Sequence, residues 1–227
     1  NSVVATFCYY LIRDKKINIF DKDKNKILKL IYIDDLVRYF IKVIETYPNI
    51  KTNYKIINYK ISIKKLSDKL IYFNNNINKN IIKNINNDFD KKLYSTLLSF
   101  FPIKKFISKI DLKKDKRGIF TEIFKNPKFG QISMFSINPN KTRGGHYHNT
   151  KTESFLVIQG KVIFILQNLN TKKRHKITIS SKDSKIIKIP SGYFHSIKNL
   201  NNNKCLILVW ANEIFNPDQH DTFTVEH

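Results

Sequence analysis

The spacing of apolar residues changes near residue 117, from a mixture of helical and strand-like runs to strand-like runs alone. The predicted helices cover residues 2–13, 36–47, 62–73 and 90–101, and the predicted strands cover residues 17–20, 27–33 and 54–61. Asp34 or Asp35 can cap the second helix, and Pro48 and Pro102 end the second and fourth helices. This alternation of strands and helices predicts an α/β arrangement for the first part of the chain.

Two polar segments lie between these elements and the strand-rich part of the chain. Residues 74–87 have low complexity and are rich in Asn, which predicts a surface loop. Residues 102–116 are basic and are expected to be partly extended. We therefore predict a first domain over residues 1–101, a linker over residues 102–116 and a second domain over residues 117–227.

The second domain is predicted to consist of β-strands only. Its strand-like runs cover residues 118–124, 130–137, 155–166, 175–180, 185–189, 196–198 and 204–210, and the third of these is a hairpin that turns at Gln159–Gly160. Short strands at regular spacing are typical of a barrel or jelly roll. The whole chain is thus predicted to be an α+β protein of two parts.

Composition adds a strong positive charge. The chain has 227 residues, 41 Lys and Arg against 18 Asp and Glu, and a net charge of +23. The excess is Lys spread through both halves, together with much Asn and Ile, and these three residues share A/T-rich codons. Base composition therefore explains the charge without a nucleic-acid partner. Arg117 and Arg143 stand out against this background, because the guanidinium group binds phosphate in a bidentate manner.

The remaining composition favours a cytoplasmic protein. No run of eighteen apolar residues predicts a membrane span, and the first residues lack the basic region of a signal peptide. Cys8 and Cys205 lie in apolar segments far apart, which predicts buried thiols in a reducing compartment. Because the chain does not begin with Met, we expect it to be a fragment that lacks its beginning.

Four residues have the chemistry and spacing of a metal site. His146 and His148 are two positions apart, so both imidazoles point to one face of a strand. Glu153 follows across a short turn, and His195 belongs to a separate strand. Three imidazoles and one carboxylate suit Zn²⁺, Fe²⁺, Mn²⁺ or Ni²⁺, with zinc favoured among them.

The same residues carry a family resemblance. His146-x-His148-x4-Glu153-x6-Gly160, followed by Pro190-x-Gly192-x2-His195-x3-Asn199, resembles the two cupin motifs, which lie on strands of a small antiparallel barrel and point their side chains inward. This chain departs from the motifs at two glycine positions, which are Asn140 and Ser184 here. Asn adopts the left-handed conformation more readily than other residues with a side chain.

A second resemblance concerns the first domain. Leu30–Val37, with the pattern Tyr-x-Asp-Asp-hydrophobic, is similar to a late segment of the extended short-chain dehydrogenases. In that family it comes after the cofactor loop and the catalytic Tyr-x-x-x-Lys pair. Neither motif is present here, so no reductase residue is assigned.

The order of several stretches makes the resemblance more specific. Lys92–Pro102, Asp115–Glu122 and Val209–Pro217, with Gly130–Gln131 and Thr142–His146, are similar to the bifunctional capsular-polysaccharide enzymes that form UDP-2-acetamido-2,6-dideoxy-L-talose. Those enzymes join a short-chain reductase to a cupin epimerase and are commonly dimers. The resemblance implies that the cupin inverts C3 of a UDP-linked 4-keto-6-deoxy-N-acetylhexosamine through an enolate. The longer parent would then reduce C4 with NADPH, and a homodimer is expected.

The resemblance also suggests roles for further residues. Arg117 and Arg143 are candidates for binding the diphosphate, and Glu122 and Gln131 for polar contacts to sugar or base. If the histidines bind a metal, the acid and base must be other groups, and the nearest candidates in sequence are Tyr147 and Tyr193. Strand alternation places Tyr147 on the face opposite its histidine neighbours, which favours a packing role for it.

Several alternatives stay open. The metal can act as a Lewis acid or be purely structural. The Asp115–Glu122 and Arg143 stretches also resemble the dTDP-4-keto-sugar 3,5-epimerases, which use the first motif histidine as base and no metal. These polar residues can instead form surface ion pairs. The domain can also be a non-catalytic module that binds a metal or a sugar, and a basic nucleic-acid binder is the least favoured class.

Overall fold

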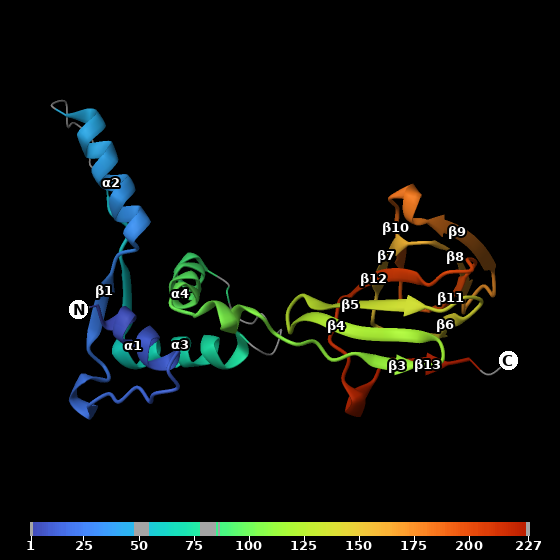
Figure 1. Cartoon of the computed structure of the whole chain (residues 1–227), viewed down its shortest axis with the longest axis horizontal. Helices are drawn as coiled ribbons and strands as arrows, with labels where there is room; N and C mark the ends of the chain where they lie inside the picture. The colour runs from blue at the N-terminus through green and yellow to red at the C-terminus, as the bar shows by residue number, and fades with distance from the viewer. Residues whose placement is uncertain (1, 48–54, 78–84, 86, 226–227) are drawn as a thin grey trace. The chain divides into compact units, whose positions relative to one another are not determined.

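The structure is a computed structural model that describes residues 2–47, 55–77, 85 and 87–225. The chain divides into two compact units, a helical unit that ends at Ile107 and a β-unit that begins at Ser108. Figure 1 shows the mixed helical part and the β-rich part of the chain. The division falls within the segment predicted to be a linker.

The described part of the helical unit contains four α-helices, a strand pair and two short 3-10 helices. Their bounds are α1 Val3–Leu11, η1 Asp21–Asp23, β1 Ile27–Leu30, α2 Ile33–Thr46, β2 Tyr59–Ser62, α3 Ile63–Ile77, α4 Asp88–Ser99 and η2 Ile103–Phe106. Strands β1 and β2 pair antiparallel, with Ile27 opposite Ser62. The four predicted helices are confirmed.

The predicted strands of this unit are partly wrong. Residues 17–20 have no regular structure, and β1 ends at Leu30 because the chain turns into α2 three residues later. Asp34 and Asp35 do not cap α2 but lie in its first turn, where a carboxylate favours the helix dipole. The start of the predicted strand at Tyr54, and Pro48, lie outside the described residues.

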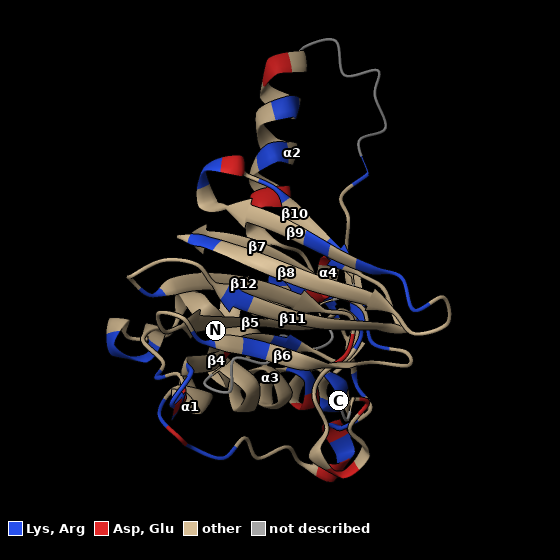
Figure 2. Cartoon of the chain, turned by 90° about the vertical axis from the view of Figure 1, so that its right-hand side faces the viewer, with Lys and Arg blue, Asp and Glu red and all other residues tan. Residues whose placement is uncertain are grey.

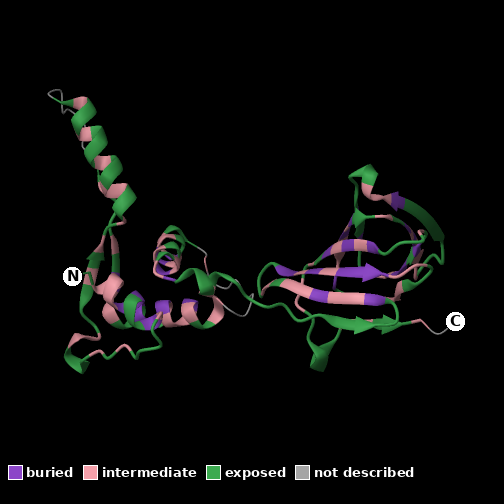
Figure 3. Ribbon diagram, in the orientation of Figure 1, coloured by how far each residue is buried: buried purple, intermediate pink, exposed green. Residues whose placement is uncertain are grey.

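The core of the helical unit is formed by one face each of α1, α3 and α4. Its fully or nearly buried side chains include Phe7, Cys8, Leu11, Leu66, Leu70, Phe73, Leu93 and Leu97. Helix α2 contributes no buried residue, which Figure 3 shows as a helix without purple segments. Residues 74–77, predicted as the start of a surface loop, extend α3 instead, and most of the rest of that loop lies outside the described residues.

The β-unit consists, over its described residues, of two antiparallel sheets. Its strands are β3 Lys113–Asp115, β4 Gly118–Asn126, β5 Gly130–Ile137, β6 Thr142–Tyr147, β7 Glu153–Gln159, β8 Lys161–Asn168, β9 Arg174–Ser180, β10 Ile186–Ile189, β11 Tyr193–Asn199, β12 Cys205–Ala211 and β13 Phe223–Thr224, with 3-10 helices η3 Ser181–Asp183 and η4 Pro217–Gln219. One sheet has the order β10-β7-β12-β5-β4-β3, and the other has the order β13-β6-β11-β8-β9. The expected β-rich second part is confirmed, but residues 155–166 do not form the predicted hairpin, because β7 and β8 belong to different sheets.

Alternating side chains of the two sheets form the core of the β-unit. The buried residues include Phe155, Val157, Phe164, Ile197 and Ile207, which come from strands of both sheets. This alternation is why the strand-like spacing could be recognised in the sequence. Figure 2 shows Lys and Arg on α2 and on strands such as β6 and β9, so the positive charge is not confined to one element.

Both cysteines are free and buried, as predicted. Burial raises the pKa of the Cys8 thiol to about 12 and also raises the pKa of Cys205. Within the described residues, none of the helices is both long and apolar enough to span a bilayer.

The two positions where the cupin motifs have glycine adopt left-handed backbone conformations. Asn140 has φ 57° and Ser184 has φ 50°. The fold therefore keeps these turns although neither residue is glycine. Asn199, the last residue of the second motif, donates hydrogen bonds from its side-chain amide to the carbonyl groups of Ile137 and Asn203, each at 2.9 Å. These bonds hold the end of the motif in place.

The Ser184 turn leads to a first prediction. A left-handed conformation destabilises the folded state by about 1–2 kcal/mol for a residue with a Cβ. Glycine avoids this strain, but its greater entropy in the unfolded state offsets part of the gain. Ser184→Gly is therefore expected to raise the free energy of unfolding of the β-unit by about 0.5–1 kcal/mol. Urea unfolding followed by tryptophan fluorescence measures this change in stability. Trp210 is the single tryptophan and lies on β12, so the signal reports on the β-unit.

Ser184→Ala is the matched control for this prediction. Alanine also lacks the hydroxyl but keeps the Cβ in the left-handed conformation, so no gain is expected from it. An equal gain from both variants would show that backbone strain is not the cause.

Candidate metal centre

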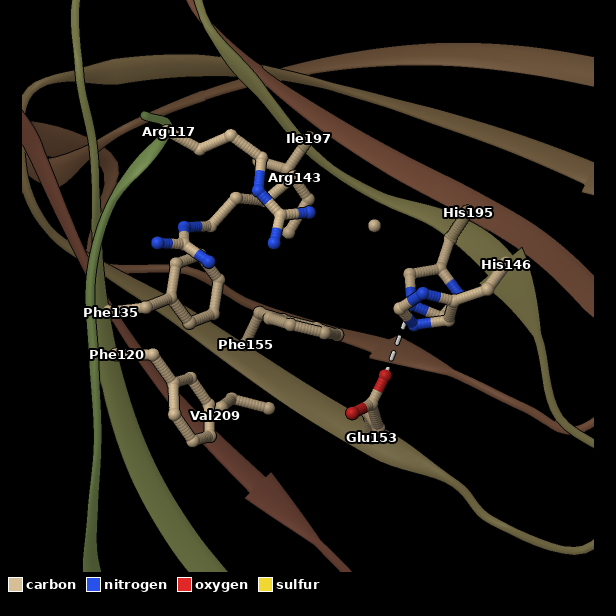
Figure 4. A pocket seen from close by; sticks show the side chains of 11 residues that line it. Arg117, Phe120, Phe135, Arg143, His146, Glu153, Phe155, His195, Ile197 and Val209 are labelled. Carbon is tan, nitrogen blue, oxygen red and sulfur yellow. Dashed lines mark ion pairs between the residues drawn. The ribbon is translucent and has the colours of Figure 1, made fainter. Parts of the chain in front are cut away.

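Strands from both sheets bring the four predicted metal ligands together. His146 lies near the end of β6 and pairs with His195 on β11, while Glu153 begins β7 in the other sheet. His148 lies just after β6. The ligand atoms of the four residues all lie within 4.8 Å of one another. The structure therefore joins two segments that are far apart in the sequence, as Figure 4 shows for His146, Glu153 and His195.

A glycine allows the close approach of β6 and β11 at this point. The register between the two strands shifts between His195 and Ser196. Gly144 has φ +85°, and a Cβ on it would lie 2.7 Å from the carbonyl oxygen of His195. A side chain at this position would push His195 away from the cluster.

The cluster contains buried polar atoms that have no hydrogen-bond partner among the described residues. The exposed fractions are 4% for His148 and 1% for His195. Glu153 Oε2 lies 3.1 Å from His195 Nε2 and 3.4 Å from His148 Nε2. Nevertheless, His148 Nε2 and Glu153 Oε2 make no hydrogen bond among the described residues. Buried polar atoms are nearly always satisfied, so this arrangement fits a cation between them.

The protonation states also suit a cation. Burial, helped by His195 and His148, lowers the pKa of His146 to about 3, so its imidazole is neutral. Burial by itself raises the pKa of Glu153, but the interactions with His148 and His195 outweigh it, and the net pKa lies below its usual range. Metal binding requires a neutral imidazole and an ionised carboxylate.

A residue of the C-terminal tail holds His148 in place. The backbone carbonyl of Asp221 contacts His148 Nδ1, which leaves Nε2 directed at the cluster. The Asp221 carboxylate accepts hydrogen bonds from the backbone N–H groups of Asn149, Thr150 and Lys151, with its closest contacts at 2.8 to 2.9 Å. Asp221 therefore fixes both the loop after β6 and the ring orientation of His148.

The cluster lies between two adjoining pockets. One has a volume of about 310 Å³ and the other about 260 Å³, and Phe120, His146, Glu153 and Val209 line both. Figure 4 shows the first pocket, with the two arginines at one end, His146, His195 and Glu153 at the other, and aromatic rings between them. Together the pockets form a cavity inside the β-unit with the cluster at its middle.

Arg117 and Arg143 line the first pocket, as a diphosphate site would require. In the structure both contact Asp115. Arg117 donates to Asp115 Oδ2 through Nε at 3.0 Å and Nη2 at 2.7 Å, and Arg143 Nη2 donates to Asp115 Oδ1 at 3.1 Å. The Arg117 guanidinium beside it lowers the pKa of Asp115 to about 2.

Glu122 and Gln131 line the second pocket. Glu122 forms ion pairs with Lys113, at 3.9 Å, and with Lys125. Gln131 donates to Ser133 Oγ at 2.7 Å. All four predicted substrate-binding residues thus line the cavity. The second pocket also contains Lys151, which no motif in the sequence singles out.

The two predicted acid/base candidates, Tyr147 and Tyr193, lie outside the lining of the two pockets. Tyr147 stacks on Phe223 with ring centroids 5.3 Å apart, and Tyr193 packs against the core of the β-unit. These contacts agree with the packing role expected for Tyr147, and the assignment of an acid or base to either tyrosine stays a prediction.

The chain is similar to proteins of known family. Residues 113–223 match the family model described as the polysaccharide biosynthesis C-terminal domain. The chain is 36% identical over 224 residues to a UDP-2-acetamido-2,6-beta-L-arabino-hexul-4-ose reductase from Pseudomonas aeruginosa, and the match covers 98% of this chain and 60% of that protein.

Solved structures agree with this similarity. The capsular polysaccharide assembling protein CapF from Staphylococcus aureus has 35% sequence identity and a TM-score of 0.91, covering 100% of this chain and 62% of that one. CapF with the inhibitor 3-isopropenyl-tropolone has 35% identity and a TM-score of 0.89, and 66% of that chain is covered. This chain thus spans about three fifths of the length of its relatives.

Proposed function

We propose that the β-unit is the epimerising part of an enzyme that modifies a nucleotide sugar for capsular polysaccharide synthesis. Its substrate is a UDP-linked 4-keto-6-deoxy-N-acetylhexosamine, and its reaction inverts C3. The observation that carries the proposal is a buried His/Glu cluster at the middle of a cavity that has two arginines at one end. The similarity to a UDP-hexulose reductase supports the substrate class.

The cavity offers what this reaction needs. The arginines bind the diphosphate, and the aromatic walls exclude water from the sugar. A general base takes the C3 proton, the electron pair of the C3–H bond forms a C3–C4 double bond, and the carbonyl π electrons move to the C4 oxygen. Return of a proton to the other face of C3 restores the ketone with inverted configuration. No oxidant or reductant is consumed.

His146, His148, Glu153 and His195 are the residues that would hold a divalent metal, with Zn²⁺ favoured. When bound, such a cation supplies Lewis acidity towards a carbonyl oxygen. The chain's own residues orient the sugar beside the cluster, and an imidazole that ligates a metal is not available as a base.

We further propose that a longer parent protein reduces C4 with NADPH and that the working protein is a homodimer in the cytoplasm. None of the described residues is assigned to the reduction.

Deuterium exchange tests the epimerase proposal. The full 227-residue chain, supplied with metal, is incubated with the 4-keto substrate in D₂O. Deuterium is expected at C3 of the recovered sugar, as measured by NMR and mass spectrometry. A folded, metal-containing sample that binds the substrate without exchange would instead be a binding module, and the epimerase proposal would be rejected.

Asp115 leads to a prediction about the diphosphate. Because Asp115 occupies both arginines, it competes with an incoming anion. Asp115→Asn keeps an oxygen for the N–H groups of Arg117 and Gly118 but removes the charge. Since an exposed ion pair contributes up to about 1 kcal/mol, UDP is expected to bind about 2- to 5-fold more tightly.

Calorimetry with UDP measures this effect, and Arg143→Gln is the opposing variant, for which weaker binding is expected. If neither variant changes the affinity for UDP, the arginines do not bind the diphosphate.

A further inference from the structure

We infer that Lys151 is a catalytic residue that stabilises the negative charge on the C4 oxygen when the C3 proton leaves. This inference rests on the proposed epimerase function. Lys151 lies between His148 and Glu153 in the sequence but is not one of the four predicted metal ligands.

The side chain of Lys151 is buried in the site. It is 7% exposed and lines the second pocket together with His146, His148 and Glu153. A buried ammonium group is costly unless an anion or several hydrogen bonds compensate for the lost water. A lysine with such burial therefore needs a partner inside the cavity.

Among the residues that the structure describes, Lys151 Nζ has only weak partners. The hydrogen bond of Lys151 Nζ to Thr222 Oγ1 is long, at 3.4 Å, and the ring of Phe215 lies 6.0 Å away. No Asp or Glu among the described side chains lies within ion-pair distance of it. The other lysine of this pocket, Lys113, does face a carboxylate, that of Glu122 at 3.9 Å. Lys151 is thus left to meet an anion that enters with the substrate.

The position of Lys151 separates its task from that of the arginines. Arg117 and Arg143 line only the first pocket, whereas Lys151 lines only the second, and His146 and Glu153 line both. If the diphosphate of a nucleotide sugar lies at the arginines, the rest of the substrate extends towards the cluster. Its sugar ring then lies close to Lys151. The charge that Lys151 meets is therefore the oxygen of the sugar and not the diphosphate.

The backbone of Lys151 is fixed as well. Its N–H donates to Asp221 Oδ2 at 2.8 Å, and Glu153, two residues later, begins β7. This backbone contact and the burial of the side chain keep the ammonium group inside the cavity, where a donor close to the developing charge stabilises it. The ammonium group donates a hydrogen bond to the enolate oxygen and keeps its proton throughout, so the balance of the reaction is unchanged.

The experiment compares Lys151→Met and Lys151→Arg by the rate of C3 deuterium exchange, with metal content and thermal unfolding measured in parallel. Loss of one preorganised oxyanion donor costs about 100- to 1000-fold in kcat. We expect Lys151→Met to show this loss with metal content and KM close to wild type. Lys151→Arg keeps the charge and is expected to recover at least a tenth of the wild-type rate.

Lys188→Met is the matched control, because Lys188 is exposed on β10, the strand that pairs with β7, and no change is expected from it. Exchange by Lys151→Met within a few fold of wild type would overturn the inference but leave the epimerase proposal intact. Absence of exchange in the wild-type chain would overturn the proposed function itself. If Lys151→Met loses metal or unfolds, Lys151→Arg is the deciding variant. A folded Lys151→Arg protein whose exchange is about 100-fold or more slower than wild type would overturn the inference.

Discussion

Alanine in place of His148 is expected to remove the bound metal from the purified protein. His148 is 4% exposed, and its Nε2 is directed at Glu153 without a hydrogen bond of its own. Loss of this ligand leaves two imidazoles and one carboxylate. Removing a residue that only orients a ligand lowers metal affinity by about 10- to 100-fold, so loss of a ligand itself is expected to lower the affinity for Zn²⁺ by more than about 100-fold. C3 exchange is expected to fall with it.

Elemental analysis after gel filtration measures this loss, with wild-type protein and the variant each incubated with Zn²⁺, Fe²⁺, Mn²⁺ or Ni²⁺. His175→Ala is the control, since His175 is exposed on β9 in the same unit and no change is expected from it. If the wild-type protein retains none of the four metals, the cluster is not a metal site. If the variant retains as much metal as wild type, His148 is not a ligand.

Asp221→Asn is expected to weaken both the fold of the β-unit and metal binding. The carboxylate accepts hydrogen bonds from the N–H groups of three successive residues and from the Thr150 hydroxyl. The amide of asparagine carries no charge and offers one oxygen instead of two. With about 1 kcal/mol for each weakened bond, the β-unit is expected to lose about 2–3 kcal/mol.

The effect of Asp221→Asn on the metal arises through the loop that this residue fixes. A looser loop lets the ring of His148 turn, and loss of such a supporting contact lowers metal affinity by about 10- to 100-fold. Competition with a metal chelator measures the affinity, and Trp210 fluorescence in urea measures the stability. Asp218→Asn, an exposed change in the same tail, is the control. Unchanged affinity with reduced stability would confine Asp221 to a structural role.

The β-unit and its cluster could be predicted because their signals are local. Alternating apolar residues define each strand, and His146, His148 and Glu153 lie within one short stretch. His195 could be added because its turn has a recognisable Pro-x-Gly pattern. The pairing of β6 with β11 then brings these residues together.

The residues that escaped prediction depend on contacts between distant segments. Asp221 lies about 70 positions after the loop that it holds, in a polar tail without a motif. Lys151 belongs to a chain rich in lysine, so only its burial distinguishes it. The strand expected at residues 17–20, Ile-Asn-Ile-Phe, is wrong because a stretch of four residues does not show by itself whether a partner strand lies beside it.

The left-handed turns at Asn140 and Ser184 have a consequence for how such proteins are recognised. At both turns a residue other than glycine adopts the left-handed conformation, so neither turn depends on glycine. Pattern searches that insist on glycine at both sites would miss chains of this kind, whereas a search keyed to the inward-facing imidazoles and carboxylate would retrieve them.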